Sequence, residues 1–416
     1  MVVKDKEVFQ KRGSGFKFQQ ELKELAKLFL KLGSIAFGGP AAHLAMFEDE
    51  VVVKRRWMTH EHFLDLYGAT NLIPGPNSTE MTIHIGKERA GWRGMMVAGL
   101  CFILPAVIIS GILGWVYKKY GSLPEVKPWI YGIQPAIIAI ILRAVFQLGR
   151  KAVKSAGMAL LGIAALAACL EGINDILVMF IAGFLAILWA IQKFKPGHNS
   201  GDKPGLRHSK HPGQNPDQNP RRYSDRISMF FAAIQIPSIT LANLTSASIF
   251  WMFLKIGAVW FGGGYVLFGL LDNELVVRGL LSRQQLMDAI AVGQITPGPL
   301  FSSVTFIGWQ MKGFAGALAA TAGIFIPSLL LVGLLNPLIP RIRNSKIFSA
   351  FLDAVNVASI AIIIAVLIVM GRNTLTEWRT ILIAMVSLAF TIFFRRINVV
   401  FIVIGGALAG YILSLI

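Results

Sequence analysis

The sequence predicts an all-α, polytopic membrane protein made of two homologous repeats whose helices are broken or re-entrant in places. Hydrophobic residues make up 55% of the chain, charged residues only 15%, and the mean hydropathy is +0.61, values that exclude an ordinary soluble domain. The two halves also repeat one another: Phe37 recurs as Phe261, 224 residues later. Pro74 recurs as Pro297, 223 residues later. Both copies place glycine and proline inside apolar sequence, where they interrupt helical hydrogen bonds.

At least seven apolar runs are long enough to cross a bilayer, which takes about 20 helical residues. The clearest are residues 95–117, 129–148, 156–170, 176–191, 314–335, 348–370 and 399–415. Residues 1–19 are polar and mixed in charge, without the apolar core of a signal peptide. We therefore expect them to form a cytosolic tail.

Basic residues give the chain a net charge of +18, but they cluster in the loops between the apolar runs. This is the pattern of the positive-inside rule, so we interpret them as topology signals rather than as a nucleic-acid surface. Cys101 and Cys169 lie inside apolar runs and lack CxxC spacing. The sequence therefore predicts no nucleic-acid partner, no metal site, no disulfide and no cofactor.

The first repeat opens with an amphipathic helix over residues 16–33, because leucine and phenylalanine recur there at helical spacing. This helix ends at Gly38-Gly39-Pro40. A second helix over residues 41–57 carries too many charged side chains to be a span that faces lipid. The start of the repeat is therefore expected to be re-entrant or interfacial.

A third helix is expected over residues 59–71, with Thr59 as its N-cap. Pro74-Gly75-Pro76 ends it, and Asn77 or Ser78 is expected to cap the helix that follows. Non-helical backbone of this kind is tolerated at membrane depth only where protein or a water-filled cavity surrounds it.

Composition divides the chain into five segments: a tail (1–19), a first repeat (20–192), a disordered cytosolic linker (193–226), an additional crossing (227–244) and a second repeat (245–416). The linker is rich in Pro, Gly, Asn, Gln and His and cannot bury a core. Basic loops lie on opposite faces in the two repeats, which predicts inverted topology, with the C-terminus outside.

The duplicated breaks are the expected substrate site, since a helix that restarts after a break presents free N–H groups and the positive end of its dipole to an anion. The alternative is that these residues only permit kinks and close helix packing. The expected substrate-binding residues are Gly38, Gly39, Pro40, Asn71, Pro74, Gly75, Pro76, Asn77, Gly262, Gly263, Gln294, Pro297, Gly298 and Pro299, together with Lys31 and Lys255.

These motifs resemble those of the chromate ion transporter family in its long, two-domain form. The first copy comprises Phe37-Gly38-Gly39-Pro40, Pro74-Gly75-Pro76 and Gly91-Trp92-Arg93-Gly94. The second comprises Phe261-Gly262-Gly263-Gly264, Pro297-Gly298-Pro299 and Gly313-Phe314-Ala315-Gly316. The resemblance implies a multi-pass antiporter of the cell inner membrane that exports chromate by the proton-motive force and confers chromate resistance. Sulfate is isosteric with chromate and remains an alternative substrate.

Several charged residues could serve transport. Lys31 and Lys255 match and could neutralise a dianion or reach towards the membrane surface. Glu50 and Glu274 also match, and could couple protons or form structural ion pairs. Glu80 and His84 share one helix face, and the second repeat replaces both by neutral residues. If one repeat carries protons, it is the first.

The expected partners are a small inorganic oxyanion, protons and the lipid bilayer, and a homodimer is left open. No Gly-rich nucleotide-binding motif is present, so ATP-driven pumping by this chain is unsupported. A membrane enzyme acting on lipid would need a polar cluster at one membrane face. The nearest set, around His43 and His60, has largely neutral counterparts in the second half. We therefore expect a transporter and no catalytic residues.

Overall fold

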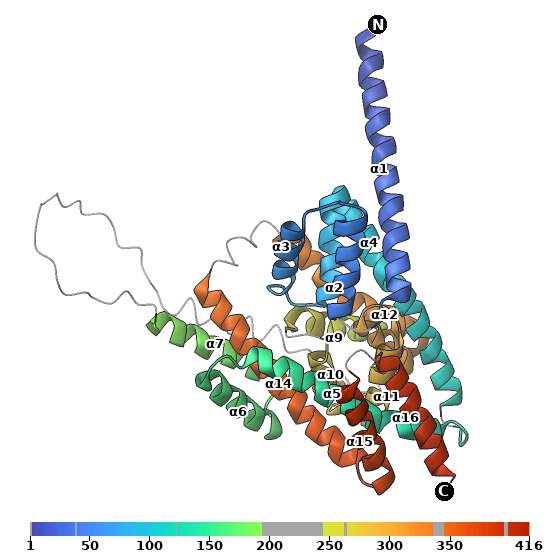
Figure 1. The fold of residues 1–416 in the computed structure, drawn as a ribbon, viewed down its shortest axis with the longest axis vertical. Helices are drawn as coiled ribbons and strands as arrows, with labels where there is room; N and C mark the ends of the chain where they lie inside the picture. Colours follow the sequence, from blue (N-terminus) through green and yellow to red (C-terminus); the bar gives the residue numbers. More distant parts are fainter. Residues whose placement is uncertain are drawn as a thin grey trace, which may run out of the picture.

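The computed structural model describes residues 2–37, 40–121, 123–193, 244–261, 264–335, 345–394 and 398–415, and these residues form helices and their connections without any strand (Figure 1). Apart from their end residues, the expected linker and additional crossing lie outside the described residues. The N-terminal end of α1 and the C-terminal end of α16 lie at opposite ends of the long axis (Figure 1).

The described residues of the first repeat form seven helices and one π-helical segment in this order: α1 (Val2–Ile35), α2 (Pro40–Glu48), the π-helical segment Asp49–Lys54, α3 (His60–Thr70), α4 (Asn77–Tyr120), α5 (Lys127–Ala152), α6 (Ala156–Leu170) and α7 (Asp175–Lys193). Helix α1 begins earlier than the predicted residue 16, since the preceding residues are rich in good helix formers and lack proline.

The described part of the second repeat follows the same order: α9 (Ser246–Val259), α10 (Val266–Leu271), the π-helical segment Asp272–Val276, α11 (Arg283–Ile295), a 3₁₀ turn (Leu300–Ser302), α12 (Ser303–Leu335), α14 (Lys346–Thr374), α15 (Trp378–Phe393) and α16 (Val399–Ser414). Both repeats place a π-helical segment directly after their second helix. The two homologous repeats predicted from the sequence are thus present in the fold.

Helices α4 and α12 each fold back on themselves. Gly91 has φ 60° and ψ −150°, and Gly313 has φ 61° and ψ −149°, a left-handed conformation that glycine adopts without penalty. Gly86 then lies against the backbone of Gly94, so the first arm of α4 packs directly on its second arm. The first arm, residues 77–89, spans about 20 Å, too short to cross a hydrocarbon core of about 30 Å.

Within the part of the chain that the structure describes, five helices are long and apolar enough to cross a membrane: Asn77–Tyr120, Lys127–Ala152, Asp175–Gln192, Leu300–Leu334 and Ile347–Thr374. They contain five of the seven predicted spans. The other two predictions, residues 156–170 and 399–415, fall on the shorter helices α6 and α16, of 15 and 16 residues.

The two repeats exchange helices. Helices α4 and α12 pack together, with α1 on α4 and α9 on α12. Helices α6 and α7 of the first repeat lie along α14 of the second, while α15 and α16 lie along α5 of the first (Figure 1). Gly132 of α5 touches the backbone of Gly406 and Gly410, which allows this close approach. Neither repeat can therefore be a separate body.

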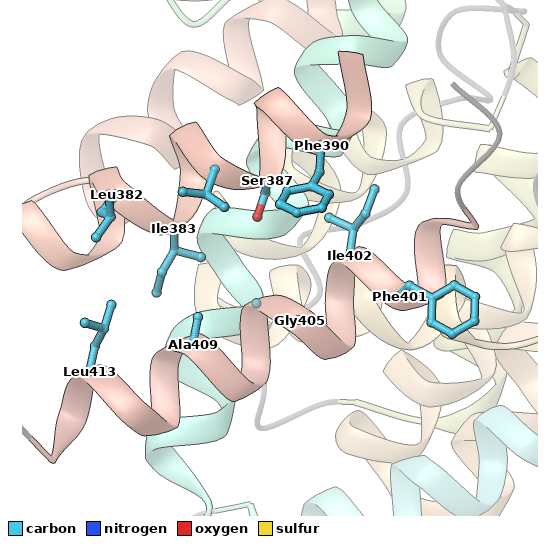
Figure 2. Close-up of a pocket in the computed structure, with 11 residues that line it drawn as sticks. Leu382, Ile383, Ser387, Phe390, Phe401, Ile402, Gly405, Ala409 and Leu413 are labelled. Carbon is cyan, nitrogen blue, oxygen red and sulfur yellow. The ribbon is translucent and has the colours of Figure 1, made fainter. Parts of the chain in front are cut away.

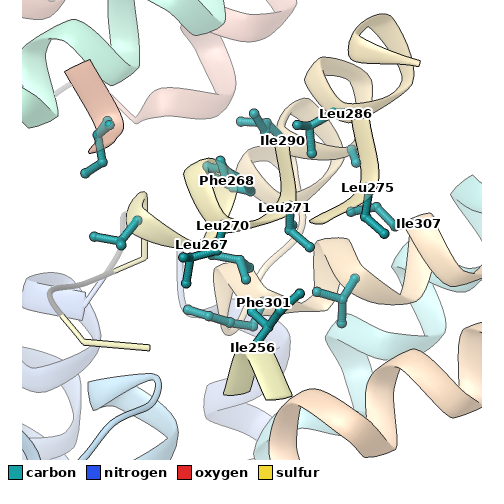
Figure 3. Packing of buried hydrophobic residues seen from close by; sticks show 14 of the residues in the cluster. Ile256, Leu267, Phe268, Leu270, Leu271, Leu275, Leu286, Ile290, Phe301 and Ile307 are labelled. Atoms are coloured by element: carbon teal, nitrogen blue, oxygen red, sulfur yellow. The ribbon is translucent and has the colours of Figure 1, made fainter. Parts of the chain in front are cut away.

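The largest core cluster surrounds the second repeat's short helices, where Leu267, Leu271 and Leu275 meet Leu286 and Ile307 (Figure 3). The first repeat has its own smaller cluster. Its fully buried members include Leu25, Leu28, Phe29, Phe47 and Phe102. The second repeat's short helices are thus the more central ones.

Of the two helix caps predicted around the first Pro-Gly-Pro loop, one is confirmed and one is wrong. Thr59 caps α3, accepting a hydrogen bond of 3.2 Å from the His62 N–H, as predicted. The predicted capping of α4 by Asn77 or Ser78 is wrong: Pro76 is the N-cap residue, and it makes no side-chain capping bond. The reason is that the Asn77 and Ser78 side chains bond elsewhere, to Asn71 and His43.

Candidate substrate site at the broken helices

The chain breaks of the two repeats meet. Helix α1 ends at Ile35, and the carbonyl oxygen of the next residue, Ala36, is free of helical bonding. It accepts a hydrogen bond of 2.8 Å from the N–H of Gly298, in the middle of the second repeat's Pro-Gly-Pro loop. The start of the first break and the second Pro-Gly-Pro loop therefore lie in contact, 262 residues apart in the chain.

Each Pro-Gly-Pro loop packs against the long helix of the other repeat. Gly75 lies so close to Ser328 of α12 and to Glu80 that an added Cβ would overlap the side-chain oxygens of both. Gly298 faces Ala106 of α4, whose Cβ would lie 3.1 Å from an added Cβ. Both glycines also have positive φ, 145° and 93°, which other residues rarely adopt. Glycine is thus required at both positions by space and by backbone conformation.

Glu80 lies in the first turn of α4, fully buried beside the Gly75 loop. Within the described residues, neither of its carboxylate oxygens has a hydrogen-bond partner. Buried polar groups are normally satisfied, so an unpartnered carboxyl group calls for a proton, an ion, water or a ligand. Other buried hydroxyls without a partner occur in the same part of the fold: Thr79, Ser302, Ser303 and Ser328.

His84, one turn after Glu80, is also buried, and its Nε2 has no partner among the described residues. The two side chains share a helix face, as predicted from their spacing. No hydrogen bond or ion pair joins them in the part of the chain that the structure describes.

His43 was not among the predicted site residues, yet it connects three parts of the site. Its Nε2 lies 3.0 Å from the Ala36 carbonyl oxygen, which can only accept, so Nε2 carries the hydrogen. Its Nδ1 lies 3.1 Å from Ser78 Oγ, which then donates to it. His43 thus holds α2 against the end of α1 and the start of α4. Its spacing gave no signal, because the Ala36 carbonyl is freed only by the break.

The matched lysines and glutamates form two ion-pair clusters. Lys31 Nζ lies 3.3 Å from Glu50 Oε1, and Arg55 lies 2.7 Å from the other carboxylate oxygen. In the second repeat, Lys255 lies 2.7 Å from Glu274, which Arg278 also contacts at 2.9 Å. Each cluster joins the helix before the break to the π-helical segment after it. The lysine charges are therefore balanced within the protein.

The cations around Glu50 do not suit a residue that takes up and releases protons. Burial raises the pKa of Glu50, but Lys31, Arg55 and Lys54 outweigh this effect and hold the pKa below its ordinary value. Glu50 is therefore ionised at neutral pH. The geometry favours a structural ion pair over proton coupling for Glu50. Glu274 makes matching contacts with Lys255 and Arg278, so the same interpretation is favoured there.

The polar residues beside the Pro-Gly-Pro loops differ between the repeats. Asn77 Nδ2 donates to Asn71 Oδ1 at 2.9 Å, which joins the ends of α3 and α4 across the first loop. Gln294 takes the place of Asn71 in the second repeat, and its buried Nε2 has no acceptor among the described residues. Gly38, Gly39, Gly262 and Gly263 lie outside the described residues, and so does the side chain of Pro40.

A cavity of about 300 Å³ lies elsewhere, between α15 and α16 (Figure 2). Its walls are apolar apart from Ser387, with Phe390, Phe401 and Ile402 among them. Such a lining offers a dianion no compensation for its lost hydration. The candidate substrate site is therefore at the breaks, not in this cavity.

Broken helices in two repeats, buried where the repeats meet, are typical of membrane transport proteins. The family model described as chromate transporter matches residues 23–187 and again residues 247–411. The chain therefore belongs to the chromate transporter family.

Curated relatives agree along almost the whole chain. A probable chromate transport protein of Synechococcus elongatus is 31% identical, covering 88% of this chain and 89% of that protein. The chromate transport protein of Cupriavidus metallidurans is 28% identical, covering 94% and 93%. An uncharacterized transporter of Bacillus subtilis, 28% identical, matches only 29% of this chain but 67% of its own length. No solved structure is significantly similar.

Proposed function

We propose that this protein is a secondary active transporter that exports chromate across the cytoplasmic membrane, driven by the proton-motive force, and that it has no enzymatic activity. Family membership supports the substrate class, since two relatives of this chain are named chromate transport proteins. The observation that carries the proposal is the contact between the first break and the second Pro-Gly-Pro loop, together with the buried carboxyl group of Glu80, which has no partner among the described residues.

We assign substrate binding to the space between the breaks. The helices that restart there, α4 and α12, present N–H groups and positive dipole ends suited to an oxyanion. Asn71, Asn77 and Gln294 add side-chain amides next to the loops. Gly75 and Gly298 allow each Pro-Gly-Pro loop to pack closely against the long helix of the other repeat, which brings the breaks together around the ligand.

Proton coupling is assigned to Glu80, with His84 as its neighbour on the helix. A carboxyl group that is buried without a counter-charge is neutral, and it releases its proton when water reaches it. The counterpart of Glu80 in the second repeat is Ser303, which carries no charge in either state. Proton movement is therefore a property of the first repeat in this proposal, and Glu50 and Glu274 have structural roles.

We further propose that the repeats are inverted, with the N-terminus and the linker in the cytosol and the C-terminus outside, in the inner membrane. The switch of basic loops between faces supports this orientation. Reporter fusions after residue 224 and after residue 416 should report opposite faces. Two fusions on the same face would reject the inversion.

Flux in liposomes tests the function. The purified protein is reconstituted into liposomes that are loaded with chromate. Chromate flux is then measured with and without a pH gradient, with sulfate and phosphate as competitors. We expect chromate flux that rises with the gradient. Flux of sulfate alone would reassign the substrate, and flux that ignores the gradient would remove the proton coupling.

A further inference from the structure

Two buried oxygens from different repeats face the same point beside Gly75. One is Glu80 Oε1 of α4, and the other is Ser328 Oγ of α12. A Cβ added to Gly75 would overlap both of them, so a single small atom can contact both. Glu80 and Ser328 are each 0% exposed, and neither oxygen has a hydrogen-bond partner among the described residues. The carboxyl group and the hydroxyl group therefore do not bond to each other.

The pocket around this point is rich in oxygen and poor in donors. Pro74 and Pro76 have no N–H group, so Gly75 is the only residue of their loop that can donate from the backbone. Glu80 adds a carboxyl group, and Ser328 adds a hydroxyl that accepts as well as donates. Buried polar groups are normally satisfied, and oxygens that converge without bonding to each other suit a shared hard cation. The chemistry of the pocket thus favours a cation over an anion.

The charge of the pocket selects a monovalent cation. Glu80 is the acid at this point, and no ion pair balances it within the described residues. One carboxylate neutralises one positive charge, whereas a divalent ion would leave an excess charge in a buried site. Ca²⁺ also takes about six to eight oxygen ligands. Broken helices of transport proteins coordinate Na⁺ and protons, so Na⁺ is the expected ion.

The charged and titratable side chains on α4 and on the helices packed against it are engaged elsewhere or exposed, within the described residues. The partnered ones are Lys31 with Glu50, His43 with Ala36 and Ser78, Lys87 with Gly333, Arg89 with Glu24, and Lys312 with Leu244. The exposed ones include His60, Glu61, His62 and Asp65 of α3. His84 shares the helix face of Glu80, but no bond joins the two in the part of the chain that the structure describes. Neutralising Glu80 is thus left to a proton or to a bound cation.

The second repeat has the same backbone geometry without these oxygens. Gly298 lies against Ala106, which is the counterpart of Ser328 by the 222-residue offset. Ser303 takes the place of Glu80. Alanine is therefore sufficient where a Pro-Gly-Pro loop packs against the facing helix, and packing alone does not explain the Ser328 hydroxyl.

We propose that Glu80 and Ser328 bind Na⁺ between the two repeats, with the carboxylate and hydroxyl oxygens as its ligands. Each repeat supplies one ligand, so the site is complete only while α12 lies against the Gly75 loop. The carboxyl group is the one that carries the proton in the proposed function, and the inference rests on that function for its role in transport. Binding itself does not require chromate.

Equilibrium binding of radioactive Na⁺ to the purified full-length protein tests the site. It is measured without chromate, with choline chloride keeping the ionic strength constant, because choline is too large for this pocket. The variants are Glu80→Gln and Ser328→Ala. The matched control is Ser303→Ala, which removes a buried hydroxyl that also has no partner among the described residues. Melting temperature is measured on every sample.

We expect the wild type to bind Na⁺ saturably. Glu80→Gln should lose this binding, because the carboxylate charge is gone. Ser328→Ala should weaken it about tenfold, since an oxygen that contacts the charge is removed. Ser303→Ala should bind as the wild type does. If Glu80→Gln does not fold, Ser328→Ala decides, because the second loop already packs against an alanine.

Two results would overturn the assignment. One is a wild type that binds no Na⁺, which would leave the two oxygens bridged by water only. The other is wild-type Na⁺ affinity in folded Ser328→Ala or in folded Glu80→Gln. Failure of the proposed function looks different: Na⁺ then binds with the expected losses in the variants, while chromate flux is absent or ignores the pH gradient.

Discussion

The short helices after the first break, α2 and α3, and those after the second, α10 and α11, have the same local geometry in different surroundings. Each pair is joined by a π-helical segment and a reversal with positive φ, 51° at Arg56 and 71° at Gly279. Helix α11 packs against α5 and α16, whereas the main contact of α3 is with α4. Burial follows this difference, since Leu64 is 47% exposed and its counterpart Met287 only 2%.

The contrast teaches that the local fold of each helix pair, α2–α3 and α10–α11, is set by its own sequence. How the pair docks against the other repeat does not follow from that local fold. Asp288 of α11 accepts hydrogen bonds from Tyr117 at 2.6 Å and from Gln134 at 3.4 Å, which tie α11 to α4 and α5. Its counterpart Asp65 is exposed. Two elements with the same local geometry, one docked against the other repeat and one more exposed, fit one end state of alternating access. We expect a second state in which α3 docks and α11 is released.

We expect the largest effect from removing the acid at Glu80, which only the first repeat has. Glu80→Gln keeps the size and the hydrogen-bonding capacity of the side chain but cannot exchange a proton. We expect this variant to fold and to bind chromate, with no dependence of flux on the pH gradient in liposomes. Ser303→Ala, the matched change in the second repeat, should leave the gradient dependence intact. Unchanged coupling in Glu80→Gln would return Glu80 to a packing role.

The next prediction compares the two ion-pair clusters. The Lys255 side chain is 12% exposed and that of Lys31 is 57% exposed, although both pair with a buried glutamate. Removing one partner of a buried pair costs about 3 kcal/mol or more, while an exposed pair contributes about 0–1 kcal/mol. Lys255→Met should therefore lower the melting temperature far more than Lys31→Met. Equal losses would show that both clusters are equally buried in solution.

A third prediction separates binding from packing at Gly75. An alanine there would overlap Ser328 and Glu80 and would need a strained positive φ. Losing one charge-assisted hydrogen bond to the anion would weaken chromate binding by about ten- to a hundredfold. Gly371 is the control, because its added Cβ meets no atom within 4 Å. Normal chromate affinity in a less stable Gly75→Ala protein would reject a substrate site at this loop.

The sequence was informative wherever a feature is local or duplicated. Both Pro-Gly-Pro loops, the Thr59 cap and the repeat itself could be recognised from residue types and spacing. The end of the first arm of α4 at Arg89 could also be placed from the sequence, but the reversal of direction at Gly91 could not, because the apolar run beyond it gives no signal of direction. The matching conformation of Gly313 shows that this reversal belongs to the repeat.

Long-range contacts explain the remaining omissions at the site. Ser328 approaches Gly75 across the repeat boundary, and no local pattern encodes that proximity. Sequence comparison of the halves finds what the repeats share. It also singles out Glu80 and His84, which the second repeat replaces, but it does not show which residues meet across the repeat boundary.

The smallest expected effect tests the docking difference itself, by hydrogen exchange of α3 and α11 in the full-length protein. Backbone amides exchange faster where an element opens more often, so α3 should exchange faster than α11 in the wild type. Asp288→Asn weakens the bonds from Tyr117 and Gln134, each worth about 1–3 kcal/mol, and should speed the exchange of α11 by about tenfold or more. Glu61→Gln, at an exposed position in the first turn of α3, is the control and should change neither helix. Equal exchange of α3 and α11 in the wild type would mean that the two elements dock equally in solution, and the expectation of two alternating states would lose its structural basis.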